Sequence, residues 1–307
     1  MHSRRPMSRS LLPFVVFLAL APMAGSTALA QSRPTARQIV DRIKLNVGVP
    51  WNEKGVDTFK DGDPDTPVTG VAVTMMATLD VLQRAAAAGA NFVITHEPVF
   101  YTHLDSTAAL EKEHDPVLAA KRDFIRAHHM VVWRFHDHWH ARRPDQIQLG
   151  MEKALGWSRY RTPANDSLGT GQPATDYLFE LPETTLGSLA SELGSRLGAR
   201  AVRVVGDPRM KVSKVAFIGG FPGFAPQRGL LRRDDVEVLV MGEAHEWETI
   251  SYAADAIAAG ERKALIVLGH NASEQGGMEE CARWLKGFVA DVPVRFIAAA
   301  DPFQSIR

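Results

Sequence analysis

Histidine and acidic side chains gather in three short segments of this 307-residue chain. Eight of the eleven histidines lie within residues 96–140, and the run His136-Asp137-His138-Trp139-His140 places three of them within five residues. Two further pairs, His96-Glu97 and His270 with Glu274, combine imidazole with carboxylate. A mixed set of nitrogen and oxygen ligands suits zinc, iron, manganese or nickel, and without thiolates it is typical of catalytic metal sites. A polar surface loop is the alternative interpretation of the triple-histidine run.

The rest of the composition narrows the classes of site and partner. Cys281 is the only cysteine, so one chain forms no disulfide, thiolate zinc site or iron–sulfur cluster, and a metal must be held by histidine and carboxylate. The sequence contains no G-x-S-x-G, P-loop or H-E-x-x-H motif, which excludes the commonest serine hydrolases, nucleoside triphosphatases and zincins. The 35 basic side chains balance 35 acidic ones, which does not favour nucleic-acid binding.

The elements that position these residues follow a strand–helix–strand pattern. A β-branched strand at Val68–Thr74, an Ala-rich helix at Leu79–Ala88 and a strand at Asn91–Thr95 predict a βαβ unit with two parallel strands. Buried strands at Met130–Phe135 and Ala264–Leu268 precede the other two histidine segments. Because parallel sheets bind ligands at the carboxyl ends of their strands, we expect three adjacent strand ends to supply one rim of metal ligands.

Strands alternate with helices along the whole chain, which predicts the α/β class with mixed or parallel sheets flanked by helices. We expect two pseudo-repeated α/β halves that form one compact unit: residues 31–161 with the His-rich ligands, and residues 176–307 with the C-terminal His/Glu pair. The Pro, Gly, Asn and Ser content of residues 162–175 predicts a linker. Segments 85–96 and 256–270 share a helix end, a glycine, a buried strand and a histidine, although a chance match between two such units is the alternative.

Residues 1–30 have the pattern of a secretory signal peptide. Three arginines precede an apolar stretch from Leu11 to Met23, and Ala28-Leu29-Ala30 forms an A-x-A cleavage site before Gln31. The apolar stretch is shorter than the roughly 20 residues of a membrane span, which disfavours the alternative of an uncleaved anchor. We therefore expect a periplasmic or secreted protein that is not membrane-bound after signal removal, with 32 basic against 35 acidic side chains.

Two histidine motifs resemble those of a known family. The segment Thr95-His96-Glu97-Pro98-Val99-Phe100 is similar to its His-His-Pro motif, and Gly269-His270-Asn271-Ala272-Ser273-Glu274-Gln275 is similar to its Gly-His-x-x-[ST]-Glu motif. Through these motifs the chain resembles the hexameric dinuclear-metal-centre proteins known as GTP cyclohydrolase 1 type 2 homologues. The Gly219-Gly220 turn, the Trp284-Leu285 pair and the Asp301-Pro302-Phe303 ending extend the resemblance over most of the chain.

The resemblance implies a site of two adjacent divalent metal ions, whose identity stays open among zinc, iron, manganese and nickel. His96, His270 and Glu274 match ligands of the family directly. Glu97 stands where the family has a second histidine. This substitution is the first departure of the chain from the family's ligand pattern.

The second departure concerns the family's central His-x-x-x-Asp motif. Aligning His136 with its histidine places His140 where a bridging aspartate is expected. The two departures look reciprocal, because at Glu97 a carboxylate replaces imidazole and at His140 an imidazole replaces carboxylate. The site would then keep its ligand count and charge. Asp137 is the alternative bridging ligand.

The resemblance also implies an assembly and two classes of function. The first hypothesis is a metal-dependent hydrolase of phosphoesters, cyclic amides or nucleotide-type small molecules, in which two metals activate a bridging water. Glu243 and His245 are then the acid–base candidates, and a solvated helix start is the alternative for His245. The second hypothesis is a non-catalytic metal-binding scaffold or a metal-handling protein. In both cases the partner of the chain is itself, in a closed homo-oligomer that the resemblance predicts to be a hexamer.

Overall fold

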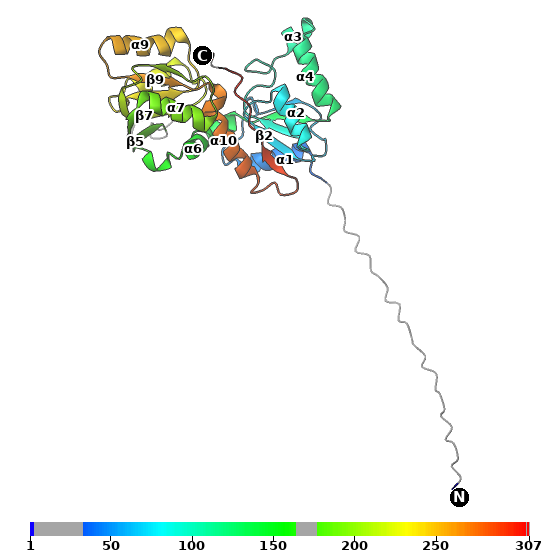
Figure 1. Ribbon diagram of the computed structural model, residues 1–307. Helices are drawn as coiled ribbons and strands as arrows, with labels where there is room; N and C mark the ends of the chain where they lie inside the picture. The colour runs from blue at the N-terminus through cyan, green and yellow to red at the C-terminus, as the bar shows by residue number, and fades with distance from the viewer. Residues whose placement is uncertain (3–32, 164–176, 305, 307) are drawn as a thin grey trace. The chain divides into compact units, whose positions relative to one another are not determined.

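Two five-stranded sheets form the framework of the computed structural model, which describes residues 1–2, 33–163, 177–304 and 306 (Figure 1). The expected signal peptide, except for its first two residues, and most of the expected linker at 162–175 lie outside the described residues. In the described part of the chain, no helix is both long and apolar enough to cross a membrane. The chain from Arg33 onward forms one compact unit.

The first sheet has the strand order β1-β4-β3-β2-β10. Strands β2, β3, β4 and β10 are parallel, and β1 pairs with β4 in antiparallel fashion at the edge. The strands span Phe59–Asp61 (β1), Val71–Thr74 (β2), Phe92–Thr95 (β3), Val131–Arg134 (β4) and Val294–Phe296 (β10). Every residue of β2, β3 and β4 is buried, which explains why these strands are nearly continuous apolar runs in the sequence.

The second sheet has the strand order β5-β7-β8-β9-β6. Its three central strands β7, β8 and β9 are parallel, and both edge strands are antiparallel to their neighbours. The strands span Leu178–Thr185 (β5), Arg203–Val205 (β6), Lys211–Ile218 (β7), Val238–Met241 (β8) and Ala264–Val267 (β9). Both sheets are therefore mixed, and the predicted α/β class is confirmed.

Helices cover both faces of each sheet, following the alternation of side chains along the strands. In the first sheet, Val71 packs in a core with residues of α1 and α10, whereas Ala72 packs with residues of α2 and α4. In the second sheet, Val215 packs in a core with residues of α6 and α7, whereas Ala216 packs with residues of α8 and α9. The α-helices span Ala36–Asn46 (α1), Leu79–Ala87 (α2), Ala108–Lys112 (α3), Pro116–Ala127 (α4), Asp137–Ala141 (α5), Gln146–Leu155 (α6), Leu186–Leu197 (α7), Phe224–Leu231 (α8), Ser251–Ala258 (α9) and His270–Leu285 (α10).

Helix α10 joins the cores of the two sheets. The sequence pattern predicts this last helix from about Glu274 to Phe288, and the helix begins earlier, at His270. Its residue Ala272 packs in the core of the second sheet, and Met278 and Leu285 pack in the core of the first. The last strand, β10, then pairs with β2. The second half of the sequence therefore completes the first sheet, so the sequence halves do not coincide with the two sheets.

Most predicted strands and helices match the structure to within a few residues, but four of the strands and α-helices named above were not predicted. They are β1, α3, α5 and α8. The first three contain three to five residues, too few to show a periodic pattern of apolar side chains. Helix α8 follows the Gly220-Phe221-Pro222-Gly223 turn and contains Pro226, so its sequence is typical of a loop.

Candidate metal centre

The candidate ligands lie beyond the ends of strands from both sheets. They follow β3 (His96, Glu97), β4 (His136, His140) and β9 (His270, Glu274). The expectation of three adjacent strand ends along one rim is wrong, because β3 and β4 belong to the first sheet and β9 belongs to the second. The segments meet because α10, which follows β9 directly, packs against β2 and β10 of the first sheet.

Helix α5 contains most of the His-rich run, and the distant Asp57 caps its start. The Oδ1 atom of Asp57 accepts the backbone N–H groups of His136, at 2.6 Å, and Asp137, at 3.0 Å. Its Oδ2 atom accepts the backbone N–H of His138 at 3.0 Å and the ring Nδ1–H of the same residue at 2.6 Å. One buried carboxylate therefore satisfies four donors and fixes the orientation of the helix that presents His136 and His140.

The Asp57 cap leads to a prediction about stability. Changing Asp57 to asparagine should lower the free energy of unfolding by about 2–4 kcal/mol, because an amide group would turn its own N–H donors toward buried donors. Urea unfolding followed by circular dichroism measures this loss. Asp65→Asn, at an exposed carboxylate paired with Arg37, is the matched control and should change stability by less than about 1 kcal/mol. Equal effects of the two substitutions would contradict the cap.

The middle histidine of the run is not available to a metal. The Nε2 atom of His138 accepts the backbone N–H of Asn52 at 2.8 Å, while its Nδ1 atom is bonded to Asp57. Its ring also stacks on Trp51, with 3.6 Å between ring centroids. Both ring nitrogens are occupied, so His138 fastens the Trp51 loop to α5.

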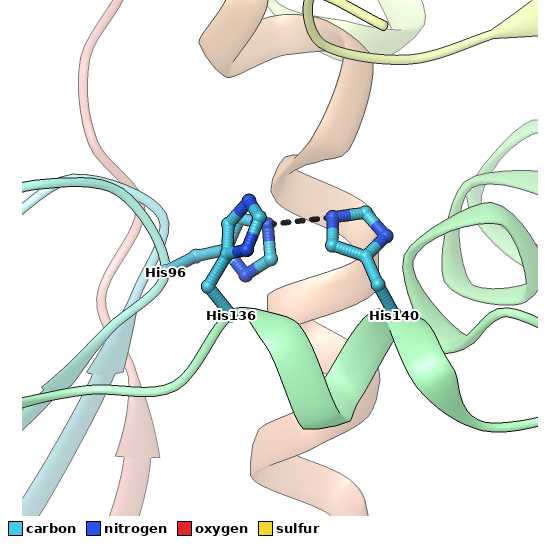
Figure 2. A group of neighbouring side chains, drawn as sticks. All are labelled: His96, His136 and His140. Carbon is cyan, nitrogen blue, oxygen red and sulfur yellow. Dashed lines mark hydrogen bonds between the residues drawn. The ribbon is translucent and has the colours of Figure 1, made fainter. Parts of the chain in front are cut away.

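The other two histidines of the run meet His96 (Figure 2). One ligand nitrogen from each of His96, His136 and His140 lies within 4.8 Å of the others. The Nε2 atoms of His96 and His140 face each other at 3.1 Å. The fold thus brings together imidazoles that follow β3 and β4 and are far apart in the sequence.

Each of these three rings has its Nδ1 atom held by an acceptor. The acceptors are the Phe135 carbonyl for His96, at 3.1 Å, Asp137 for His136, at 2.9 Å, and Asp145 for His140, at 2.9 Å. A histidine that binds a metal typically donates its other ring N–H to a carbonyl or carboxylate, which fixes the tautomer and the ring orientation. The three Nε2 atoms are therefore presented as metal ligands. Asp137 acts here as a partner of His136, and its carboxylate is outside the two ligand groups.

Two carboxylates complete the cluster around His96. One oxygen each of Glu97 and Glu274 forms a second group with His96, all within 4.8 Å of one another. The Nε2 atom of His270 lies 3.2 Å from Glu97 Oε1 and 3.3 Å from Glu274 Oε2. Glu274 Oε2 is buried and has no hydrogen-bond partner among the described residues. A cation would satisfy this oxygen, so the donor set fits a divalent metal.

A glycine turn after β7 holds Glu274 against the histidines. Gly220 has a positive φ of 58°, and a side chain at this position would collide with the Glu274 carboxylate. A side chain at Gly219 would approach Glu274 Cγ to 2.8 Å. The turn therefore needs glycine both for its backbone conformation and for the close approach of the carboxylate.

The pKa values of three histidines in the cluster are strongly shifted. Burial lowers the pKa of His96 well below its ordinary value, and the neighbouring His136 and His140 lower it further. Burial also lowers the pKa of His140, but Asp145 outweighs this effect and the pKa rises to about 9. For His270, burial is likewise outweighed, by the carboxylates of Glu243, Glu274 and Glu97, and the pKa rises to about 12.

Glu97 is a largely buried carboxylate with a strongly lowered pKa. Burial raises its pKa, but the bond to His270 and the charges of His270, His136 and Arg134 lower it to about 2. The Arg134 guanidinium is fully buried and lies 3.7 Å from Glu97 Oε2. The carboxylate at this position therefore contacts Arg134 through Oε2 and the histidines through Oε1.

The two acid–base candidates lie at different distances from the cluster. Glu243 Oε1 is 3.5 Å from His270 Nδ1, and this contact lowers the pKa of Glu243. His245 pairs with Glu248 at 3.1 Å and stacks on the exposed Trp247, with 4.4 Å between ring centroids. Glu243 therefore touches a candidate ligand directly, whereas the contacts of His245 are with Glu248, Trp247 and Phe221.

Comparison with known proteins agrees with this geometry. Residues 37–302 match the family described as Duf34/NIF3 (NGG1p interacting factor 3). The chain belongs to the Duf34/NIF3 family. The resemblance inferred from the two histidine motifs is confirmed, since relatives bear the name "GTP cyclohydrolase 1 type 2 homolog". One from Chlamydia muridarum is 21% identical over 255 residues, which cover 82% of this chain and 93% of that protein. One from Chlamydia pneumoniae is 26% identical over 270 residues, with the same coverage.

Solved structures show the same Duf34/NIF3 fold. A Bacillus cereus protein related to NIF3 matches with a TM-score of 0.66 at 16% identity, and the match covers 90% of this chain and 100% of that one. A Staphylococcus aureus hypothetical protein matches with a TM-score of 0.64 at 19% identity, covering 89% of this chain and 100% of that one. At these identities the likeness establishes the fold alone.

Three residues of this Duf34/NIF3 site were missed from the sequence. They are Asp57, Arg134 and Asp145, which cap α5, neighbour Glu97 and hold His140. Asp145 had a usable signal, because an acidic residue directly before a helix is a typical N-cap, and its Oδ1 atom does accept the N–H of Ile147 at 2.9 Å. An arginine at the end of a buried strand was a second such signal.

Proton release provides a test of metal binding in this Duf34/NIF3 protein. Because the pKa values of His140 and His270 are raised to about 9 and about 12, both rings are protonated in the metal-free protein at pH 7. A metal must displace these protons, so its affinity should rise as the pH increases from 6 to 9. Calorimetric titration of manganese or zinc in buffers of different ionisation enthalpy counts the released protons. Identical heats in every buffer would contradict the protonation of these ligands.

Proposed function

We propose that this protein is a hydrolase that uses two divalent metal ions, which are held by His96, Glu97, His136, His140, His270 and Glu274. The observation that carries the proposal is the buried Oε2 atom of Glu274, which has no hydrogen-bond partner among the described residues and lies 3.7 and 3.3 Å from nitrogens of His96 and His270. The two candidate ligand groups adjoin at His96, whose Nε2 atom binds one ion, and the carboxylates of Glu97 and Glu274 supply oxygen donors for a second ion close by. The nitrogen and oxygen donors suit zinc, iron, manganese or nickel.

A cavity of about 370 Å³ opens onto these residues. Its lining includes Glu97, His140 and His270 from the cluster, and Phe221 and Pro222 from the glycine turn. The volume lies within the range of sites for small molecules. When bound at such a cluster, a pair of divalent ions lowers the pKa of a water to near 7 and polarises a phosphoryl or amide oxygen. This chemistry suits phosphoesters, cyclic amides and nucleotide-type substrates.

The acid–base roles are assigned to Glu243 and His245. Glu243 lies 3.5 Å from the Nδ1 atom of His270 and is positioned to pair with the N–H group of that ring and to orient it. His245 contacts Phe221, with 4.8 Å between ring centroids, and Phe221 lines the cavity. We therefore assign the protonation of the leaving group to His245.

The experiment that tests this function is a screen of the purified, metal-loaded protein. Phosphate esters, cyclic amides and nucleotides should include at least one substrate, and His270→Ala should abolish its turnover. His128→Ala, at an exposed histidine on the end of α4, is the matched control and should retain full activity. Activity that survives the loss of His270 would contradict a metal-dependent reaction at this site.

The second candidate function is a metal-binding scaffold or metal-handling protein without catalysis. It is favoured by the departures at Glu97 and His140, where the ligand types differ from those of the family's motifs. Tight metal binding with no turnover in the same screen would support this function. Metal analysis and anomalous scattering from crystals would identify the ion in either case.

Assembly and location are proposals from the sequence. The family resemblance supports a closed homo-hexamer, which light scattering across micromolar concentrations would measure. The A-x-A site before Gln31 supports export to the periplasm or the medium. N-terminal sequencing of exported protein should then begin at Gln31, and an intact Met1 in a membrane fraction would contradict cleavage.

A further inference from the structure

A second cavity adjoins the metal cluster at Glu97. Its volume is about 360 Å³, large enough for a small organic molecule. It shares Glu97 and His103 with the cavity that contains the other candidate ligands. Apolar side chains, among them Met76, Leu79 and Val99, form much of its wall. A molecule in this cavity therefore lies directly beside the candidate metal centre.

The cavity also contains a buried amine. Lys121, on α4, is 3% exposed, and its Nζ atom donates to the Val99 carbonyl at 2.6 Å. The nearby Asp105 is already paired with Lys60, at 3.3 Å, and with Arg134, at 3.7 Å. No ion pair found among the described residues includes Lys121. An ammonium group has three donors, and the structure assigns one of them, so the amine has capacity for an anionic partner.

The start of helix α2 adds positive potential to the same cavity. Ala77, Thr78 and Leu79 line it, and Thr78 is the N-cap of this nine-residue helix. The N-terminal N–H groups of a helix carry a partial positive charge that attracts anions. Glu97, which also lines the cavity, has its carboxylate directed at His270 and Arg134, at 3.2 and 3.7 Å. Its charge is therefore already compensated at the boundary with the metal cluster.

We propose that this cavity is a subsite for the anionic group, a carboxylate or a phosphate, of a small molecule with an apolar body. Lys121 and the start of α2 bind the anion, the apolar wall holds the body, and the far end of the molecule reaches the metal cluster past Glu97. That this molecule is a substrate rests on the proposed hydrolase function, but the binding of the molecule to the cavity does not. Burial lowers the pKa of Lys121 to about 8 although the charge of Asp105 raises it, which agrees with an amine that forms no ion pair among the described residues.

The test measures binding to the purified, metal-free protein, in which the metal-dependent reaction cannot occur. Phenyl phosphate and benzoate should bind in calorimetric titrations, and neutral benzamide should bind at least about tenfold more weakly. Lys121→Met should weaken the two anions by at least about tenfold and leave benzamide unchanged. Lys112→Met, at an exposed lysine of α3, is the matched control and should change none of the affinities. A preference for one of the two anions identifies the charged group that the subsite takes.

A second measurement does not depend on a variant. Reductive methylation of the wild-type protein, read by peptide mass spectrometry, should modify Lys121 more slowly when phenyl phosphate is present. Anion affinity that is unchanged in folded Lys121→Met, or methylation of Lys121 that phenyl phosphate does not slow, would overturn the proposal. If the anions bind to the protonated histidines instead, their affinity should fall in His270→Ala and stay unchanged in Lys121→Met. That result would also overturn the proposal. An inactive metal centre would leave the expected binding results unchanged, so the two proposals fail separately.

Discussion

Replacing Glu274 with glutamine should lower the affinity for divalent metal ions by at least about 100-fold, because even partners of metal ligands contribute 10- to 100-fold. The substitution keeps the size of the side chain, so the fit against the Gly220 turn is preserved. It removes the negative charge that faces His96 and His270 and leaves an amide, which is a weak ligand for the proposed ions. Titration of the metal-free protein with manganese or zinc measures the loss.

The control for this prediction lies on the same helix. Glu279 is an exposed residue of α10 that pairs with Arg283 at 3.1 Å, and Glu279→Gln should leave metal affinity unchanged. Circular dichroism of both variants verifies that α10 remains folded. Metal affinity within about threefold of the wild type in Glu274→Gln would remove Glu274 from the ligand set, since a lost ligand costs far more than that.

Exchanging the side chains at positions 97 and 140 should restore metal binding that each single exchange reduces. Glu97→His leaves Arg134 with Asp105 as its acidic neighbour and removes charge from the site. His140→Asp places a second carboxylate beside Asp145, which now accepts the Nδ1–H of His140 at 2.9 Å. Each single exchange should weaken metal binding by about 10- to 100-fold. The double exchange should recover much of the loss, because the ligand count and total charge return.

The measurement for this exchange is a complete double-mutant cycle. Metal stoichiometry and affinity are determined for the wild type, both single variants and the double variant. We expect a coupling free energy of about 0.5–3 kcal/mol, the range for residues in one network. Additive losses would show that the two departures are independent. Asp137 would then be tested as the bridging ligand, by Asp137→Asn in the same titration.

The strands around the site were predictable because the signal for each of them lies within its own few residues. Strands such as Val131–Arg134 are buried on both faces, so their apolar runs are visible without knowledge of their neighbours. The histidines that follow these strands could also be identified as candidates, since the carboxyl ends of parallel strands are where such sheets bind ligands. The start of α10 at His270 was less visible, because its first turn contains polar residues that pack inside the protein.

The contacts that orient the ligands were not predictable, because they join residues far apart in the sequence. Asp57 binds His138 across 81 positions, and Arg134 contacts the carbonyl of His96 across 38. No spacing rule connects such pairs. The arrangement of strand ends also depended on long-range packing, since β9 lies in the second sheet and reaches the cluster through α10.

Helix α10 connects the proposed metal site to the packing of both sheets. Its first residues present His270 and Glu274, and its later residues, including Leu285, belong to the core of the first sheet. A single stiff helix therefore links ligand geometry to the docking of both sheets. Removal of the ions by a chelator should loosen the two sheets together, as one cooperative transition whose midpoint follows the concentration of free metal. The midpoint of thermal unfolding would then measure how much of the proposed site is occupied by metal.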